Sequence, residues 1–355
     1  QNKGTVELTT KIANDSGEAA EGISIESAVL KKGSEEVIET KTTQVDTLAA
    51  GESTTVESSL VVSNPEKWNV WDQGDQTMYV VRTMVKKGDQ VLDTYETEFG
   101  FRYFDFDQET GFSLNGEKMK LRGVCMHHDQ GALGGEAWRR AIERQVEILK
   151  DMGCNAIRVT HNPAAQSLIE ICNEQGMLVI DEAFDTWSNP KNGNSNDYAK
   201  HFKAQIGADN QIEGGAPNMT WAEFDIKSMV ERGKNAPSVI MWSLGNEIFE
   251  GLNGGANYSD YDSIAQDLID WVEDVDSTRP TTFGQNNNHG GNEAFEVAKV
   301  VNDNSGVVGL NYASEAKMTE WNKKGWKTYG SETASAINSR GVYEYKGGGA
   351  QTPNQ

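Results

Sequence analysis

The chain has 355 residues with 54 acidic and 32 basic side chains, which gives a net charge of −22 at pH 7. This acidic balance argues against nucleic acid and anionic membranes as partners, because both bind basic protein surfaces. No apolar run reaches the ~18 residues that cross a bilayer, so membrane insertion is not expected. The N-terminus does not resemble a signal peptide. We expect a soluble protein with a neutral substrate, long enough for two domains.

Residues 1–106 are predicted to form an immunoglobulin-like β-sandwich. Four segments alternate apolar and polar residues with the period of half-buried strands, and they span 5–12, 23–30, 54–62 and 78–85. Short strands spaced by about ten residues, with little helical pattern, favour a sandwich. The aromatic-rich stretch 99–106 is predicted to join this domain to the next and to pack against both.

Residues 107–355 are predicted to form a (β/α)8 TIM barrel that lacks its last strand. After a hairpin with its turn at Asn115-Gly116, strand-like and helical segments alternate, as in a parallel α/β fold. The predicted strands are 120–126, 156–160, 177–182, 238–247, 281–284, 306–312 and 326–331, and the predicted helices are 137–152, 164–175, 221–232 and 261–275. The tail 346–355 is predicted to be a loop. A polar insertion at 188–218 is expected to wall a substrate cleft.

Two of the predicted strands end in a glutamate, Glu247 and Glu332. Active sites of parallel barrels lie at the carboxyl ends of the strands, so we expect both carboxyl groups to face one cleft. Such a pair, about 5–5.5 Å apart, suffices for retaining glycoside hydrolysis: one group protonates the leaving oxygen and the other attacks the anomeric carbon. The alternative is a core strand followed by an ordinary surface glutamate.

Other polar side chains follow the predicted strands and are candidates for binding sugar hydroxyls: His127, His128, Asp129, Arg158, His161, Asn162, Asp181, Glu182, Asp185, Asn246 and Tyr312. Trp187 and Trp242 are candidates for an aromatic floor, although Trp242 is expected to pack inside. A catalytic transition metal is not expected, because adjacent histidines point to opposite sides of a strand. No cofactor is required, and a structural Mg²⁺, Ca²⁺ or Na⁺ held by carboxylates stays open. The three cysteines lie in apolar segments and are expected to be buried free thiols; they are Cys125, Cys154 and Cys172.

Several of these stretches resemble glycoside hydrolase family two. They are Leu-Arg-Gly-Val at 121–124, Ile-Arg-Val-Thr-His-Asn-Pro at 157–163, Val-Ile-Asp-Glu-Ala at 179–183, Pro-Ser-Val-Ile-Met-Trp-Ser-Leu-Gly-Asn-Glu at 237–247 and Tyr-Gly-Ser-Glu-Thr-Ala-Ser at 329–335. The fourth stretch is highly specific, and the resemblance, closest to the bacterial β-galactosidases, covers nearly the whole chain. It implies exo-acting, retaining hydrolysis of terminal β-D-galactosyl residues, in lactose or in a galactosylated glycan.

The resemblance also implies roles for individual residues. Glu247 matches the general acid/base and Glu332 the nucleophile, whereas Asn246 would hold the sugar 2-hydroxyl and Tyr312 would hydrogen-bond the nucleophile. The remaining implied substrate ligands are His161, Asp185, His127 and Trp187.

The chain departs from the family in two respects. The family has a sugar-binding jelly-roll domain before the sandwich and an eighth barrel strand with a tryptophan, and neither is found. We therefore expect the site to be complete only in a longer chain, with further domains, or with another polypeptide that supplies the missing parts. The resemblance and the acidic, Thr- and Asn-rich sandwich favour an extracellular bacterial enzyme, although the sequence does not fix the compartment.

Three alternatives to a β-galactosidase stay open. One is a non-catalytic carbohydrate-binding fragment, because the barrel is truncated. The others are a β-mannosidase and a β-glucuronidase of the same family. A glucuronidase should offer cations to the carboxylate of its substrate, and we find no Asn-x-Lys pair near a strand end that would serve. The Ser-Leu-Gly-Asn-Glu form at 243–247 favours a galactosidase.

Overall fold

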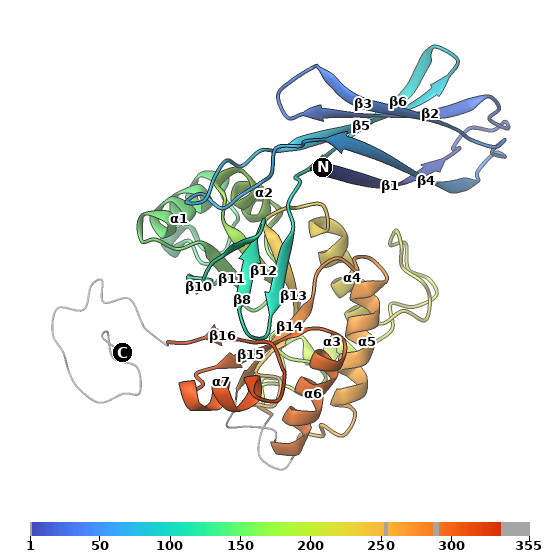
Figure 1. Ribbon diagram of the computed structural model, residues 1–355. Helices are drawn as coiled ribbons and strands as arrows, with labels where there is room; N and C mark the ends of the chain where they lie inside the picture. The colour runs from blue at the N-terminus through green and yellow to red at the C-terminus, as the bar shows by residue number, and fades with distance from the viewer. Residues whose placement is uncertain (1, 252–254, 287–290, 335–355) are drawn as a thin grey trace.

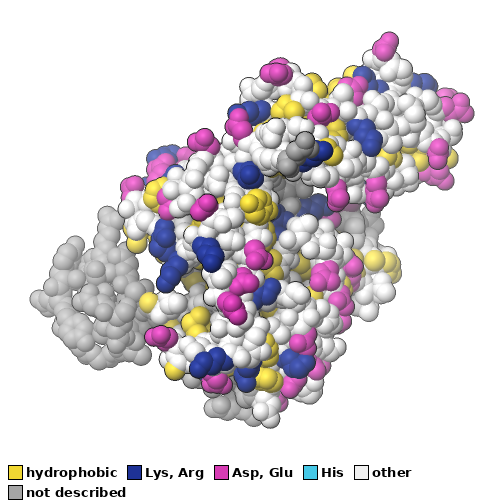
Figure 2. All heavy atoms as spheres, viewed as in Figure 1, with side chains coloured by type: hydrophobic (Ala, Val, Ile, Leu, Met, Phe, Trp, Pro, Cys, Tyr) yellow, Lys and Arg dark blue, Asp and Glu magenta, His cyan; other side chains and the backbone are white. Residues whose placement is uncertain are grey.

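The computed structural model describes residues 2–251, 255–286 and 291–334. A β-sandwich, blue in Figure 1, is followed by an α/β barrel that runs from green to red. The fold class predicted from the sequence is confirmed: a β-sandwich precedes a parallel, nearly closed barrel. Figure 2 shows acidic side chains scattered over both parts on the visible face, with basic ones between them.

The sandwich consists of two antiparallel sheets, ordered β1-β4 and β3-β2-β5-β6. Its strands are β1 (Lys3–Ala13), β2 (Ile23–Lys31), β3 (Val37–Gln44), β4 (Ser53–Ser63), β5 (Tyr79–Lys87) and β6 (Gln90–Phe99). Strands β3 and β6 were not predicted. Nearly all of their residues are exposed, so neither strand carries the buried alternate face that reveals a strand in a sequence.

Seven parallel strands form the barrel sheet within the described residues, and they pair in sequence order. They are β10 (Gly123–Met126), β11 (Ala156–Val159), β12 (Leu178–Glu182), β13 (Val239–Asn246), β14 (Thr281–Asn286), β15 (Val307–Asn311) and β16 (Thr328–Glu332). All eight residues of β13 are buried, which explains its continuous apolar sequence, because strands of parallel sheets are covered on both faces. The tail predicted as a loop, 346–355, lies outside the described residues.

Helices follow the strands and pack outside the sheet (Figure 1). They are α1 (Arg139–Asp151), α2 (Gln166–Gln175), α3 (Ala199–Phe202), α4 (Trp221–Gly233), α5 (Tyr261–Glu273), α6 (Gly291–Asp303) and α7 (Glu315–Asn322), with a 3₁₀ turn η1 (Gly131–Leu133). The helices α6 and α7 were not predicted. The insertion 188–218 contains one short helix, α3, and is otherwise irregular.

The sandwich is tied to the amino ends of the barrel strands, opposite to the ends that carry the acidic residues. Trp68 and Trp71 donate their indole N–H groups to the carbonyls of Asn173 and Cys154, each at 2.8 Å. Arg102 donates to two carbonyls at the start of β13. The small sheet of β7 (Phe104–Asp107), β8 (Gly111–Leu114) and β9 (Glu117–Lys118) packs on the same end.

The aromatic stretch between the domains packs both ways, as predicted. Phe99 and Phe101 pack against the sandwich core. Phe104 and Phe106 join the cluster at the amino end of the barrel. This packing leaves the carboxyl ends of the strands clear of the sandwich junction.

Candidate active site

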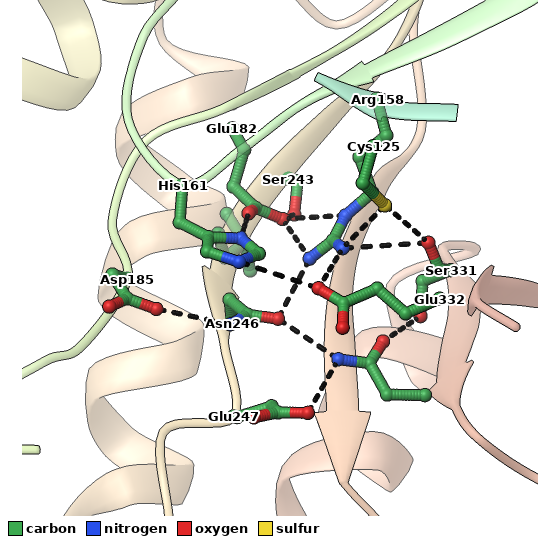
Figure 3. A network of polar contacts seen from close by, with 12 residues as sticks. Cys125, Arg158, His161, Glu182, Asp185, Ser243, Asn246, Glu247, Ser331 and Glu332 are labelled. Atoms are coloured by element: carbon green, nitrogen blue, oxygen red, sulfur yellow. Dashed lines mark hydrogen bonds and ion pairs between the residues drawn. The ribbon is translucent and has the colours of Figure 1, made fainter. Parts of the chain in front are cut away.

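A connected network of polar side chains occupies the carboxyl ends of the barrel strands (Figure 3). Its members come from β10, β11, β12, β13, β15 and β16 and from the loops that follow β11, β12 and β13. Because parallel strands end at one edge of the sheet, residues more than 200 positions apart in sequence meet here. Cys125 and Ser331, for example, are joined by a hydrogen bond from Sγ to the carbonyl, at 3.2 Å.

Glu332 lies at the end of β16, with its side chain 11% exposed. Its Oε1 accepts a hydrogen bond from Arg158 Nη1 at 3.0 Å, and its Oε2 accepts one from the Tyr312 hydroxyl at 2.6 Å. His161 Nε2 lies 3.4 Å from the same Oε1. Burial and the hydrogen bond to Glu332 both raise the pKa of the Tyr312 phenol, so the phenol stays protonated and acts as a donor.

Arg158 is held in place by Glu182, which is completely buried. Glu182 Oε2 accepts from Arg158 Nε at 3.0 Å and Nη2 at 2.6 Å, and also from the Ser243 hydroxyl at 2.7 Å. Its Oε1 lies 2.7 Å from His161 Nδ1. A buried charge needs a partner of this kind, and Glu182 thereby fixes two of the three groups that approach Glu332, namely Arg158 and His161.

Gly284 on β14 leaves the space that Arg158 occupies. A Cβ at this position would lie 2.4 Å from Arg158 Nη2 and 3.0 Å from Asn246 Oδ1. The first distance is too short for a real Cβ and the second is tight, so any larger residue would displace the guanidinium. The glycine is therefore part of the site, although it has no side chain.

Glu247 has different surroundings. Its Oε1 accepts from Asn311 Nδ2 at 3.0 Å, and the same amide donates to Asn246 Oδ1 at 3.0 Å. Burial raises the pKa of the Glu247 carboxyl; the Asn311 hydrogen bond opposes this, while the charges of Glu250 and Glu332 add to it. A raised pKa is what a carboxyl group needs to donate a proton near neutral pH.

Two of these residues adopt left-handed backbone conformations. Glu247 has φ of 44° and Tyr312 has φ of 54°, values that non-glycine residues seldom adopt outside sites that hold them in place. Glu247 N–H donates to the Gly284 carbonyl at 2.7 Å, and Tyr312 N–H to the Glu332 carbonyl at 2.7 Å. These bonds fix where both side chains begin.

The structure brings together most of the residues predicted for the site: Glu247, Glu332, Asn246, His161, Asp185 and Tyr312. His127 lies at the margin. It is exposed, and its ring meets the His161 ring edge-on at 5.2 Å between centroids.

The prediction that Trp187 contacts the sugar is wrong. It is completely buried, donates its indole N–H to the Leu244 carbonyl at 2.9 Å and packs against Tyr261. A side chain with no exposed surface cannot form the floor of a sugar pocket, so Trp187 belongs to the core. Trp242 is also buried, as expected, and bonds to Asp276.

The prediction that Cys125 is buried is also wrong. Cys154 and Cys172 are buried free thiols as predicted, but Cys125 is partly exposed and lies 3.5 Å from Arg158 Nη1. Its strand, β10, is the first of the sheet and has no described neighbour on its outer side. An apolar sequence therefore did not imply full burial here.

Sequence reasoning missed Lys191 and Asn311. Lys191 belongs to Asn189-Pro190-Lys191, an Asn-x-Lys triplet in the loop after β12 that was not recognised from the sequence. Its Nζ donates to Asp185 Oδ1 at 2.5 Å and to the Asn246 carbonyl at 3.2 Å. Asn311 ends β15 directly before Tyr312. Position at a strand end was the signal that could have revealed it.

Over residues 2–251, 255–286 and 291–334, no group of three or more His, Cys, Asp and Glu side chains is placed to hold a metal ion. Most polar side chains of the site instead hydrogen-bond one another. No described helix is long and apolar enough to cross a membrane.

A parallel barrel with carboxyl groups gathered at the carboxyl ends of its strands is an architecture of glycoside hydrolases. The family model of glycosyl hydrolases family 2 matches residues 1–102, and the model of the TIM barrel domain of the same family matches residues 107–352. The chain belongs to glycosyl hydrolases family 2.

Similar proteins act on more than one sugar. A β-galactosidase from Bacteroides ovatus is 33% identical over 338 residues, which are 88% of this chain and 36% of that protein. A β-glucuronidase from Bacteroides fragilis is 28% identical over 227 residues, 64% of this chain and 29% of that protein. A family 2 member from Bacteroides cellulosilyticus has a similar structure, with a TM-score of 0.78 and 32% identity over 94% of this chain and 39% of that one. The chain thus spans about a third or less of the length of these curated relatives.

Proposed function

We propose that the chain carries the catalytic site of a retaining, exo-acting β-galactosidase, which removes terminal β-D-galactosyl residues by double displacement. The observation that carries the proposal is the contrast between two carboxyl groups of one network. Glu332 is bound by a guanidinium and a phenol, whereas the pKa of Glu247 is raised. Retaining hydrolysis needs one ionised and one protonated carboxyl group.

In the first step, the Glu332 carboxylate attacks the anomeric carbon while the Glu247 carboxyl protonates the glycosidic oxygen. The bond between the anomeric carbon and that oxygen breaks, the aglycone leaves as an alcohol, and a glycosyl ester to Glu332 forms. Arg158 and Tyr312 orient the attacking carboxylate through their bonds to its two oxygens.

In the second step, Glu247 acts as a base. The negative charge of Glu332 is lost in the ester, so one cause of the raised pKa of Glu247 disappears. The Glu247 carboxylate then takes a proton from water, the oxygen of which attacks the anomeric carbon and releases the sugar with its configuration retained. Asn246 lies between the two carboxyl groups in the network and would hold the 2-hydroxyl of the sugar.

Two observations support galactose as the sugar. The relative from Bacteroides ovatus, which matches 88% of this chain, is a β-galactosidase. In addition, the cations of the site are engaged by the protein's own carboxylates: Arg158 by Glu182 and Glu332, and Lys191 by Asp185.

A β-glucuronidase is the second candidate. It is favoured by Lys191, a lysine with a side chain only 15% exposed at the edge of the site, and by the β-glucuronidase among the relatives. The charge of this lysine would have to be shared between Asp185 and the carboxylate of the substrate.

The test is covalent trapping with 2-deoxy-2-fluoro-β-galactosyl fluoride. The fluorine destabilises the oxocarbenium-like transition state, so the glycosyl ester accumulates and intact-mass spectrometry detects it. We expect a gain of one fluorogalactosyl group on the peptide that contains Glu332, and no gain in the Glu332→Gln variant. Rates on the nitrophenyl β-galactoside, β-glucuronide and β-mannoside rank the sugars.

The other outcomes of this experiment distinguish the candidate functions. Labelling by the corresponding 2-deoxy-2-fluoro-β-glucuronyl fluoride, with none by the galactosyl reagent, would support the second candidate. Sugar binding without labelling by any analogue would contradict a catalytic site and favour a carbohydrate-binding fragment.

A further inference from the structure

Lys191 and Asp185 form an ion pair at the edge of the site (Figure 3 shows Asp185 pointing toward Asn246). The lysine Nζ lies 2.5 Å from Asp185 Oδ1, and the same oxygen accepts from Asn246 Nδ2 at 3.0 Å. The lysine side chain is 15% exposed and the aspartate side chain 46%. Among the described residues, no hydrogen bond reaches Asp185 Oδ2, so this oxygen is left to accept from a ligand.

The position of Lys191 is fixed by its own backbone. Its N–H donates to Asp197 Oδ2 at 2.7 Å, and the next residue, Asn192, donates to the Glu250 carbonyl at 2.7 Å. A β-bridge joins Lys191 to Gly251. The loop after β12 is thus attached to the segment after β13, and the ammonium group is held beside Asn246 rather than free in solvent.

The charges of the site are predominantly negative. The network and its immediate neighbours contain five carboxyl groups and two permanent cations, namely Glu182, Asp185, Glu247, Glu250, Glu332, Arg158 and Lys191. Every guanidinium nitrogen of Arg158 donates to Glu182, Asn246 or Glu332. Of these two cations, Lys191 is therefore the one with which an anionic ligand would have to form an ion pair.

We infer that the Asp185–Lys191 pair makes the site select neutral over anionic sugars. Asp185 neutralises the ammonium and presents Oδ2 as an acceptor for a sugar hydroxyl. A substrate carboxylate would compete with Asp185 for the ammonium group of Lys191, and the negative charge of Asp185 would repel it. The pair is bonded to Asn246, which joins the same network as Glu247, and charges in water act over ~10 Å at moderate salt. This inference rests on the proposed function, because it assumes that the sugar binds at those glutamates.

The ionisation of Asp185 agrees with this role. Burial opposes its ionisation, but the charge of Lys191 and the bonds from Lys191 and Asn246 outweigh burial and lower the pKa of Asp185. The aspartate is thus charged at neutral pH, and it is an acceptor rather than a donor toward a ligand.

The experiment compares two ligands that differ only at C6, galactose and galacturonate. Their dissociation constants are measured by NMR titration for the wild type, Asp185→Asn and Lys191→Met, at low and at high salt. The matched control is Asp260→Asn, which removes the carboxylate from the exposed pair of Lys203 and Asp260; in the described residues this pair has no bond to Asp185 or Lys191.

We expect the wild type to prefer galactose. Asp185→Asn removes a charged acceptor and should weaken galactose binding roughly tenfold. The same variant frees Lys191 and should strengthen galacturonate binding roughly tenfold, so the ratio moves toward the acid by on the order of 100-fold. Lys191→Met should move the ratio the other way, high salt should shrink both shifts, and Asp260→Asn should leave the ratio unchanged.

A ratio that is unchanged in Asp185→Asn, or that moves in the same direction in both site variants, would overturn the inference. So would a wild type that binds neither sugar. A merely structural role of the pair would weaken both ligands alike and leave their ratio constant. Covalent trapping separates the two proposals: labelled protein with an unchanged ratio refutes only this inference, and a shifted ratio without labelling refutes only the proposed function.

Discussion

The site has two halves with different surroundings for a carboxyl group: a cationic half around Glu332 and a second half around Glu247. On the side of β11 and β16, Glu332 meets a guanidinium, a phenol and an imidazole. On the side of β13, Glu247 is partly buried and lies near the amide of Asn311 and the carboxyl groups of Glu250 and Glu332. Both residues are glutamates at strand ends, so the difference comes from their neighbours alone. Environment, rather than residue type, assigns the acid and the nucleophile in such pairs.

Removing the carboxylate from the cationic half should have the largest effect. In Glu332→Gln the amide cannot attack the anomeric carbon, and we expect turnover to fall by on the order of 10⁴-fold or more. Initial rates on nitrophenyl β-galactoside measure this loss. Substantial residual activity, after contaminating enzyme has been excluded by active-site titration, would show that Glu332 is not the nucleophile.

Removing the carboxyl group from the other half should have a smaller effect that depends on the substrate. Glu247→Ala should slow substrates with poor leaving groups by on the order of 10²–10⁴-fold and affect activated aryl substrates less. Azide should restore part of the rate, because a small anion can replace water without a base.

The pH dependence of the wild type sharpens the same point. Glu247 must be protonated to act as the acid, so activity should fall as the pH rises through its raised pKa. The pH profile of kcat/KM measures this limb. Full activity of Glu247→Ala on substrates with poor leaving groups, or the same high-pH limb in that variant, would contradict the assignment.

Weakening the support of the cationic half tests why it differs. Glu182→Gln leaves the shape of the side chain but removes the charge that holds Arg158 and His161. We expect kcat to fall on the order of 10²-fold, because a misplaced catalytic group is costly even when it is present. Thermal unfolding is measured in parallel, since the buried Arg158 also loses a counter-charge. An unchanged kcat in a folded variant would mean that Arg158 is held without Glu182.

A third carboxyl group extends the comparison to stability. Asp181 precedes Glu182 on β12 and is completely buried, but its Oδ2 has no hydrogen-bond partner and lies 3.9 Å from Arg232. Burial raises the pKa of Asp181 to about 6. The folded state therefore keeps a proton that the unfolded state has already released, and this group lowers stability as the pH rises from about 4 to 6.

Asp181→Asn should remove that dependence and leave turnover nearly unchanged. The difference in unfolding free energy between variant and wild type should shift by about 2 kcal/mol in favour of the variant between pH 4 and pH 7. Urea unfolding at several pH values measures it. A difference that is constant with pH would show that Asp181 ionises normally in the folded protein.

The sequence by itself determined the architecture and the two glutamates. The continuous apolar run of β13 and the alternation of strand and helix indicate a parallel α/β sheet, since the strands of such a sheet are buried on both faces. Strand ends then carry the functional groups, which is how Glu247, Glu332 and Asn246 could be predicted. The exposed strands β3 and β6 escaped because they have no buried face to produce a pattern.

Only the tertiary structure decided what each side chain does. Trp187 follows the same strand as Asp185, yet one is completely buried and the other points toward Asn246. Sequence position does not tell these apart, because an irregular loop has no period that assigns a face. Lys191 and Asn311 belong to the site because both contact Asn246, which lies 55 and 65 positions away from them in the sequence. Charge and burial at an active site are set by neighbours in space, and those neighbours exist only once the barrel has formed.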